Sequence, residues 1–150
     1  MKIQNLKINN FRSYENLKLN FSPEINILYG KNGTGKTNII EAIYCLALTK
    51  SFRTNNDKNL IKQGKNSTLI EGNILTNINT KYCLSINEDG KKTEIDDNKQ
   101  DKISDYVSKI NVILFNPDDT KIINESPNIR RRLLNIEISQ LYKEYLLLLN

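Results

Sequence analysis

Alternation of polar and apolar residues near the start of the chain predicts two β-strands. Residues 2–8 (KIQNLKI) follow this pattern, and Leu17, Leu19 and Phe21 repeat it in the segment NLKLNF. Successive side chains of a strand point to opposite faces, so the pattern is typical of a strand buried on one face. The sequence therefore predicts two strands joined by the polar connection NNFRSYE, which carries Arg12.

The hydrophobic spacing changes within the next part of the chain. The segment INILY at 25–29 is apolar and rich in β-formers, which predicts a buried central strand. Residues 36–49 then place apolar side chains at helical spacing. We expect this helix to have one buried face, formed by Ile39, Ile40, Ile43, Leu46 and Ala47.

A polar, basic segment from Lys50 to Lys65 has few core positions and predicts a surface loop or a short helix. Residues 68–75 and 81–86 return to the strand pattern. The sequence NEDG at 87–90 predicts a turn, and KKTEI after it predicts a return strand. We expect these three strands to form a small β-meander.

The last third of the chain predicts helices around one more strand. Residues 101–110 predict a short helix, and NVILF at 111–115 predicts a second buried strand. Ser126 is a favourable N-cap and Pro127 suits the first helical position, so we expect one helix from there to the C-terminus. This helix ends just after four leucines, and we expect the chain to be part of a longer protein.

Composition narrows the classes of function. The chain has 150 residues, 38% of them hydrophobic, and no apolar run near the ~20 residues that span a bilayer, so we expect a soluble, intracellular protein. It has no histidine, which excludes histidine-based triads and metal sites. Cys45 and Cys83 form no CxxC pair, and we expect both to be reduced core residues. The net charge of +5 permits contact with nucleic acid without establishing it.

Residues 30–37, GKNGTGKT, match the phosphate-binding pattern GxxxxGK[ST] between the predicted strand and the predicted helix. Its glycines allow backbone N–H groups to approach a phosphate, helped by the positive end of the following helix. Lys36 would reach the β- and γ-phosphates, and Thr37 would offer a hydroxyl to Mg²⁺. Asn32 could bond near the γ-phosphate or only shape the loop. The alternative is a glycine-rich turn that holds no ligand.

The motif predicts a nucleoside triphosphate but not the base or the work done. Hydrolysis needs a further acidic site, usually at the end of another buried strand. Asp118 and Asp119 follow the predicted strand at 111–115 and could contact magnesium, or they could form a solvated turn. Both interpretations stay open at the level of sequence.

Four blocks in order give the whole chain a resemblance to the N-terminal part of the RecF family. They are LKINNFRSYENLKLNFSPEINILYGKNGTGKTNIIEAIYCLALTKSFRT, EG at 71–72, VILFNPDD at 112–119 and SPNIRRRLLN at 126–135. Related SMC ATPases share the FRSY and phosphate-loop features but usually lack the combination of SFRT with PDD and SPxxRRR. The resemblance implies an α/β P-loop NTPase fold of the ABC/SMC head type, lobe I with an added β-meander.

The resemblance also implies a function. Such heads dimerise face to face on two ATP molecules with Mg²⁺. RecF-like proteins are cytoplasmic, bind single-stranded or gapped DNA and its junctions with duplex, and load recombinase with RecR and RecO. They act in DNA repair, replication and the SOS response. A metabolic P-loop kinase and an SMC-like structural ATPase are the alternatives, although no heptad pattern supports the latter.

The resemblance assigns roles by position. Arg12 in NFRSY matches an arginine near the nucleotide in related heads. The predicted nucleotide-binding residues are therefore Gly30, Lys31, Asn32, Gly33, Thr34, Gly35, Lys36, Thr37, Asn38 and Arg12, with Thr37 also as the metal ligand. The candidate DNA-binding residues are Arg53, Lys58, Arg130, Arg131 and Arg132. The three consecutive arginines point in different directions on a helix and oppose its dipole at the N-terminus.

Some family features are missing. No LSGGQ-like signature and no apolar run ending in Asp-Glu occur, and Asn135 stands where the family usually has aspartate. We therefore expect this chain to bind ATP without hydrolysing it alone. We expect a P-loop lobe over 1–125, with the meander at about 68–95, and the first helix of a second lobe over 126–150.

Overall fold

The computed structural model describes residues 1–115 and 127–148 of the chain. Its strands are β1 (Lys2–Phe11), β2 (Tyr14–Asn20), β3 (Ser67–Leu75), β4 (Asn79–Asn87), β5 (Gly90–Ile95) and β6 (Asn98–Lys99). Its helices are α1 (Lys36–Leu48), the 3-10 helix η1 (Asp57–Leu60), α2 (Ile103–Val107), α4 (Pro127–Leu141) and α5 (Lys143–Leu148).

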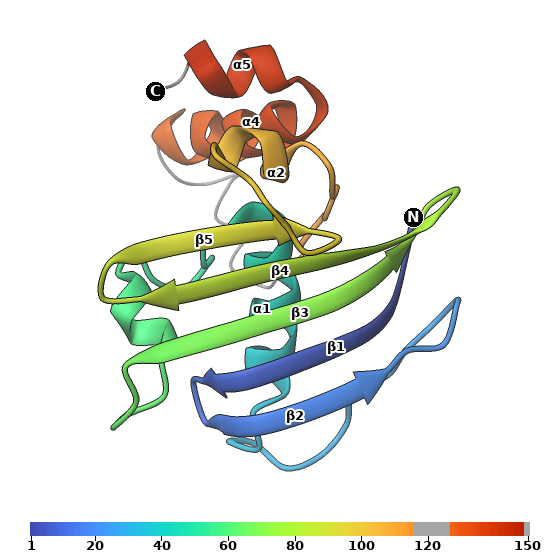
Figure 1. The fold of residues 1–150 in the computed structure, drawn as a ribbon, viewed down its shortest axis with the longest axis vertical. Coiled ribbons are helices and arrows are strands. Elements are labelled where there is room, and N and C mark those ends of the chain that lie inside the picture. The colour runs from blue at the N-terminus through green and yellow to red at the C-terminus, as the bar shows by residue number, and fades with distance from the viewer. Residues whose placement is uncertain (116–126, 149–150) are drawn as a thin grey trace.

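The six strands of the described residues form one antiparallel sheet in the order β2-β1-β3-β4-β5-β6, of which Figure 1 labels β1 to β5. The register places Leu6 of β1 between Leu19 of β2 and Gly72 of β3, so apolar positions of neighbouring strands share a face. The predicted strands at 2–8, 17–21, 68–75 and 81–86 and the return strand are confirmed. The predicted meander is continuous with the first two strands, and the polar connection between those strands is reduced to Arg12 and Ser13.

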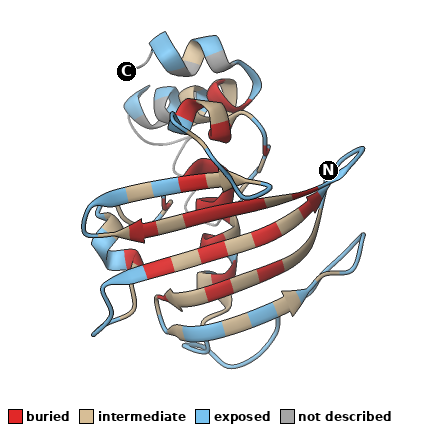
Figure 2. Cartoon of the chain, in the orientation of Figure 1, coloured by how far each residue is buried: buried red, intermediate tan, exposed pale blue. Residues whose placement is uncertain are grey.

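Helix α1 covers one face of this sheet and crosses behind its central strands (Figure 1). A β-carbon built on Gly72 would lie 2.7 Å from Cδ2 of Leu46, so the glycine allows the helix to approach the sheet closely. Burial is concentrated on β1, β3, β4 and α1 (Figure 2). The core there includes Leu6, Ile8, Ile70, Leu84, Ala42, Cys45 and Leu46.

The buried face of α1 differs in part from the predicted one. Ile39, Leu46 and Ala47 are buried as expected, whereas Ile40 is 42% exposed. Ile40 lies about 200° around the helix axis from Ala42, which is on the buried face. The prediction that Ile40 belongs to that face is therefore wrong.

Two predicted buried strands are wrong. Residues 25–29 and 111–115 have no regular structure, and Ile27 and Phe115 are 79% and 87% exposed. The side chain of Asn26 accepts a hydrogen bond from Ser22 N and donates one to Ser22 O, which forms a turn before the phosphate loop. A strand needs a neighbour to pair with, and no segment of the described chain pairs with either stretch.

Helices α2, α4 and α5 gather at one end of the molecule, beyond β5 (Figure 1). The short helix predicted within 101–110 is confirmed as α2, and Pro127 opens α4 as predicted, while Ser126 lies outside the described residues. The prediction of a single C-terminal helix is wrong, because the helix is interrupted at Tyr142. The backbone amide of Tyr145 donates a hydrogen bond to Tyr142 O. The hydroxyl of Tyr145 donates to Asn135 Oδ1 at 2.7 Å, and this contact holds α5 against α4.

The two cysteines are free and buried, as predicted. Cys45 is on α1 and Cys83 is on β4. Burial raises the pKa of Cys45 to about 12 and that of Cys83 to about 11. Both are thiols at neutral pH and therefore poor nucleophiles.

Tyr106 of α2 carries a buried hydroxyl with no hydrogen-bond partner among the described residues. Its ring packs edge-on against Tyr82, with centroids 5.8 Å apart. Removing an unsatisfied buried hydroxyl removes its desolvation penalty, so Tyr106→Phe should leave the free energy of unfolding unchanged or raise it by about 1 kcal/mol. Tyr145→Phe is the matched control, because it deletes a bonded hydroxyl and should lower stability by about 1 kcal/mol. Urea unfolding of both variants checks this, and a clear loss for Tyr106→Phe would contradict it.

Candidate functional site

The predicted phosphate loop lies on the surface between the turn at 22–26 and the start of α1. Gly33 and Gly35 have φ of +83° and +95°, the left-handed region that favours glycine. Thr34 Oγ1 donates to Lys31 O at 2.9 Å and closes the loop on itself. The backbone of the loop therefore has the curved form that can surround an anion.

Lys36 holds its charge inside this loop. Its ammonium donates to Gly30 O at 2.8 Å and to Lys31 O at 2.7 Å. Carbonyl oxygens are weaker partners for an ammonium than phosphate oxygens, since hydrogen bonds between two charged groups are the stronger ones. The lysine is thus placed to meet a phosphate bound in the loop. Thr37, the next residue, is exposed.

Helix α1 begins at Lys36 without a side-chain cap. Gly35 is its N-cap residue in a left-handed conformation, and the first turn contains no acidic residue. The positive end of the helix dipole therefore faces the loop with no carboxylate of its own. Combined with the loop and Lys36, this arrangement favours a phosphate.

The turn between β1 and β2 packs against the phosphate loop. Tyr14 Oη donates to Thr34 O at 3.3 Å, and Asn38 Nδ2 donates to Ser13 Oγ at 2.9 Å. Arg12 in the same turn has φ of +52°. The structure thus brings the predicted residue Arg12 beside the predicted residues 30–38, and it adds Ser13 and Tyr14, which the sequence did not single out.

Glu41 is the centre of the polar network beneath this turn. Its carboxylate is fully buried and accepts both Arg12 Nε at 3.0 Å and Arg12 Nη2 at 2.6 Å. Ser51 Oγ donates to it at 2.6 Å and Arg53 Nη1 at 3.1 Å. Glu41 is not among the site residues predicted from the sequence, although a charged residue inside an apolar helical stretch signals a buried partner.

Burial alone would raise the pKa of Glu41, but the hydrogen bonds from Arg12 and Ser51 outweigh it and hold the pKa below the ordinary value of 4.5. A carboxyl whose pKa is lower in the folded state contributes stability above its unfolded pKa and loses it in acid.

We therefore expect the free energy of unfolding to be constant above about pH 5 and to fall as the pH drops through the lowered pKa of Glu41. Urea unfolding between pH 3 and pH 7, roughly the window in which a carboxyl titrates, checks this. In Glu41→Gln the dependence on pH should be shallower than in the wild type. An equally steep decline in both proteins would contradict the assignment.

The candidate DNA-binding residues are spread over two regions. Arg53 belongs to the network of Glu41, and Lys58 lies exposed in η1. Arg130 and Arg131 are exposed in the first turn of α4, among the helices beyond β5 (Figure 1), and Arg131 Nη1 donates weakly to Asn128 Oδ1 at 3.5 Å. The side chain of Arg132 lies outside the described residues, as do Asp118 and Asp119.

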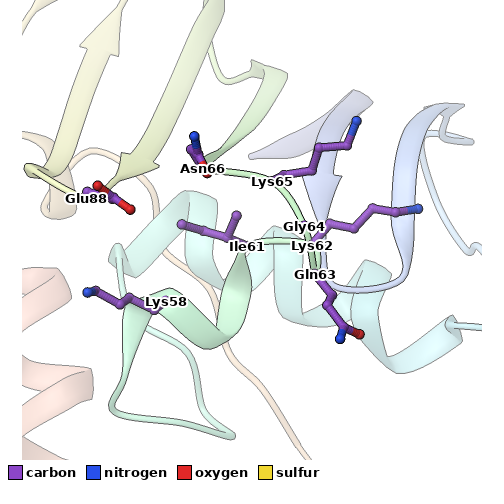
Figure 3. Close-up of a pocket in the computed structure, with 8 residues that line it drawn as sticks. All are labelled: Lys58, Ile61, Lys62, Gln63, Gly64, Lys65, Asn66 and Glu88. Atoms are coloured by element: carbon purple, nitrogen blue, oxygen red, sulfur yellow. The ribbon is translucent and has the colours of Figure 1, made fainter.

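A basic pocket of about 190 Å³ lies beside Lys58 (Figure 3). The 58–66 segment lines most of it, with Lys58, Lys62 and Lys65 at its rim and Glu88 of the β4–β5 turn opposite. Lys62 and Lys65 also pair with Glu15, at 3.7 Å and 3.3 Å. The positive charge of this segment is thus partly balanced.

Among the described residues, no helix is long and apolar enough to cross a membrane. No group of three or more acidic, histidine or cysteine side chains in that part of the chain could hold a metal ion.

Comparisons with known proteins cover nearly the whole chain. Residues 2–136 match the profile of the RecF/RecN/SMC N-terminal domain. The chain is 44% identical over 147 residues to the DNA replication and repair protein RecF of Macrococcus caseolyticus, and 42% identical over 147 residues to that of Listeria welshimeri. Each match covers 97% of this chain and 40% of the relative, so the chain spans about two fifths of the relatives' length.

Solved structures give the same result. A RecF-ATP structure, described as the recombination mediator protein in the RecFOR pathway, aligns with a TM-score of 0.92 at 28% identity, over 97% of this chain and 40% of its own. A structure from work on ATP-driven dimerisation and DNA-stimulated activation of SMC ATPases aligns with a TM-score of 0.70 at 21% identity, over 91% of this chain and 99% of its own. The latter likeness establishes the fold alone.

Proposed function

The chain belongs to the RecF/RecN/SMC N-terminal domain family, and we propose that it is the ATP-binding part of a DNA replication and repair ATPase. The observation that carries this proposal is the loop 30–37, with the ammonium of Lys36 held inside it and an uncapped helix N-terminus behind it. The relatives named RecF and the RecF-ATP structure support the choice of ATP. The alternative function, a metabolic P-loop kinase, is not supported, because the match to the RecF/RecN/SMC family runs over residues 2–136.

In this proposal the residues of the chain bind and orient the triphosphate. Backbone N–H groups of 30–37 surround the β-phosphate, and Lys36 leaves its carbonyl partners for the β- and γ-phosphates. Tyr14 and Asn38 hold the loop against the β1–β2 turn, so the backbone is positioned before the nucleotide arrives.

We assign Thr37 as the protein ligand of Mg²⁺. Its side chain is exposed directly after Lys36, where a bound triphosphate would place its oxygens. Magnesium usually takes one or two protein oxygens and completes its shell with phosphates and water, so a single hydroxyl fits without an acidic cluster. When bound there, the ion would supply positive charge that neutralises part of the charge of the phosphates.

Beyond ATP binding, the finer functions are inferred by family. We propose that ATP drives dimerisation of the head, that the dimer binds single-stranded or gapped DNA and supports recombinase loading with RecR and RecO-type partners, and that it also supports the SOS response. We place the boundary between the first lobe and the start of the second at residues 125 and 126. We expect residues 1–150 to bind ATP without hydrolysing it.

DNA binding is tested by its dependence on salt. If Lys58 contacts a phosphate, Lys58→Gln should weaken binding to a gapped oligonucleotide at all sequences and reduce the slope of log affinity against log salt by about 1. Lys99→Gln, which removes an exposed lysine on β6, is the matched control and should leave the slope unchanged. No ATP-dependent DNA binding by the wild type would defeat the repair proposal, and an unchanged slope for Lys58→Gln would exclude that residue from the contact.

A further inference from the structure

The buried carboxylate of Glu41 joins three segments that are far apart in the sequence. It is fully buried on α1, five residues after Lys36. Arg12 reaches it from the β1–β2 turn, and Ser51 and Arg53 reach it from the segment after α1. If one segment moved away, its partner in the ion pair would keep an uncompensated buried charge, which is unfavourable. These contacts therefore hold all three segments together.

The charges around Glu41 do not balance. One carboxylate faces two guanidinium groups, which leaves one positive charge beside the phosphate loop. Arg12 makes two short bonds to Glu41, and its side chain is 19% exposed. Arg53 makes a single bond to Glu41, at 3.1 Å, and its side chain is 43% exposed. Arg53 is therefore the less firmly held of the two.

A short chain of hydrogen bonds links this cluster to the phosphate loop. Asn38 Oδ1 accepts Arg53 Nη1 at 3.0 Å, while Asn38 Nδ2 donates to Ser13 Oγ at 2.9 Å. The backbone N–H of Asn38 donates to Gly35 O at 2.8 Å. A rearrangement of residues 35–38 around a phosphate would therefore act directly on the position of Arg53.

The same cluster holds the segment that carries Lys58. Arg12 Nη1 donates to Asn59 O at 2.7 Å, and the amide of Arg12 donates to Leu60 O at 2.8 Å. On the other side, the ammonium of Lys91 on β5 bonds Thr49 O and pairs with Asp57 at 2.9 Å. Residues 49–60 are thus bonded to β5 on one side and to the Arg12–Glu41 pair on the other.

We propose that Glu41 is a positioning residue: it sets Arg12 and Arg53 beside the phosphate loop and so couples ligand binding at residues 30–38 to the basic segment 49–60. This inference rests on the proposed function, because the ligand is the nucleotide assigned there. It adds that the response to ATP passes through Glu41 to the segment that carries Lys58. Asn38 connects the ligand side, and the Arg12 contacts with Asn59 and Leu60 connect the other side.

Hydrogen exchange of peptides from residues 49–62, without and with saturating Mg·ATP, tests the coupling. In the wild type, ATP should slow exchange in this segment as well as in the phosphate loop. In Glu41→Gln, the slowing should persist in the loop and be lost in the segment. Glu71→Gln is the matched control, since Glu71 also pairs with two cations, Lys7 and Lys81, but lies on the sheet, and it should respond as the wild type does.

Arg53→Gln keeps the test decisive if Glu41→Gln fails to fold. This variant leaves the Arg12–Glu41 pair intact and should also lose the ATP-induced slowing in the segment. The inference is overturned if either variant keeps the full slowing, or if the wild type binds ATP with no change in residues 49–62. A wild type that does not bind ATP at all would instead contradict the proposed function.

Discussion

Lys36→Ala should lower the affinity for ATP by about a hundredfold or more and leave the stability of the fold unchanged. The ammonium lies inside the loop and donates to two backbone carbonyls, Gly30 O at 2.8 Å and Lys31 O at 2.7 Å, so its loss removes no core packing. A hydrogen bond to a charged group contributes about 1.5–3 kcal/mol, and two such bonds to phosphates correspond to a factor of roughly 100 or more.

Isothermal titration calorimetry with Mg·ATP measures the change in affinity, and thermal unfolding measures stability. Lys18→Ala is the matched control, because it removes an exposed lysine of β2 and should bind ATP as the wild type does. An affinity for ATP in Lys36→Ala within a few-fold of the wild type would remove Lys36 from the site.

Gly35→Ala should destabilise the protein by roughly 2–4 kcal/mol and distort the phosphate loop. The residue has φ of +95°, which costs an L-amino acid about 1–2 kcal/mol. A β-carbon there would also lie 2.6 Å from Tyr14 Oη and 2.9 Å from Tyr14 Cζ, so the β1–β2 turn would have to move. ATP affinity should fall together with stability.

Gly64→Ala separates the two causes of that loss. Gly64 has φ of +80°, and nothing lies within 4 Å of a β-carbon built on it. Gly64→Ala should therefore lower stability only by the cost of the left-handed backbone, about 1–2 kcal/mol, and leave ATP affinity unchanged. Equal losses of stability in the two variants, measured by urea unfolding, would contradict the contact between Tyr14 and the loop.

Local patterns were sufficient to predict strands β1 to β5 and α1, because alternation and helical spacing are properties of the segments themselves. They failed for residues 25–29 and 111–115. Apolar sequence indicates that a segment can be buried, but burial also needs a partner strand, and pairing is not encoded locally. Among the described strands none pairs with these residues, and Ile27 and Ile113 are 79% and 85% exposed.

The candidate site, too, could be predicted from the sequence only in part. The spacing of glycines, Lys36 and Thr37 predicts the phosphate loop without a structure, since the chemistry is contained in eight consecutive residues. The network of Glu41 could not be predicted so. Its partners Arg12 and Ser51 lie 29 and 10 residues away in sequence, and only the packing of α1 on the sheet brings them together.

Titration of the uniformly labelled protein with Mg·ATP, followed by backbone amide NMR, shows whether residues 30–38 bind the nucleotide, because the amide groups of the loop are themselves the proposed ligands of the phosphates. We expect the largest shifts at residues 30–38, with smaller ones at Arg12 and Ser13. ATP binding that leaves the amides of 30–38 unshifted would contradict this assignment.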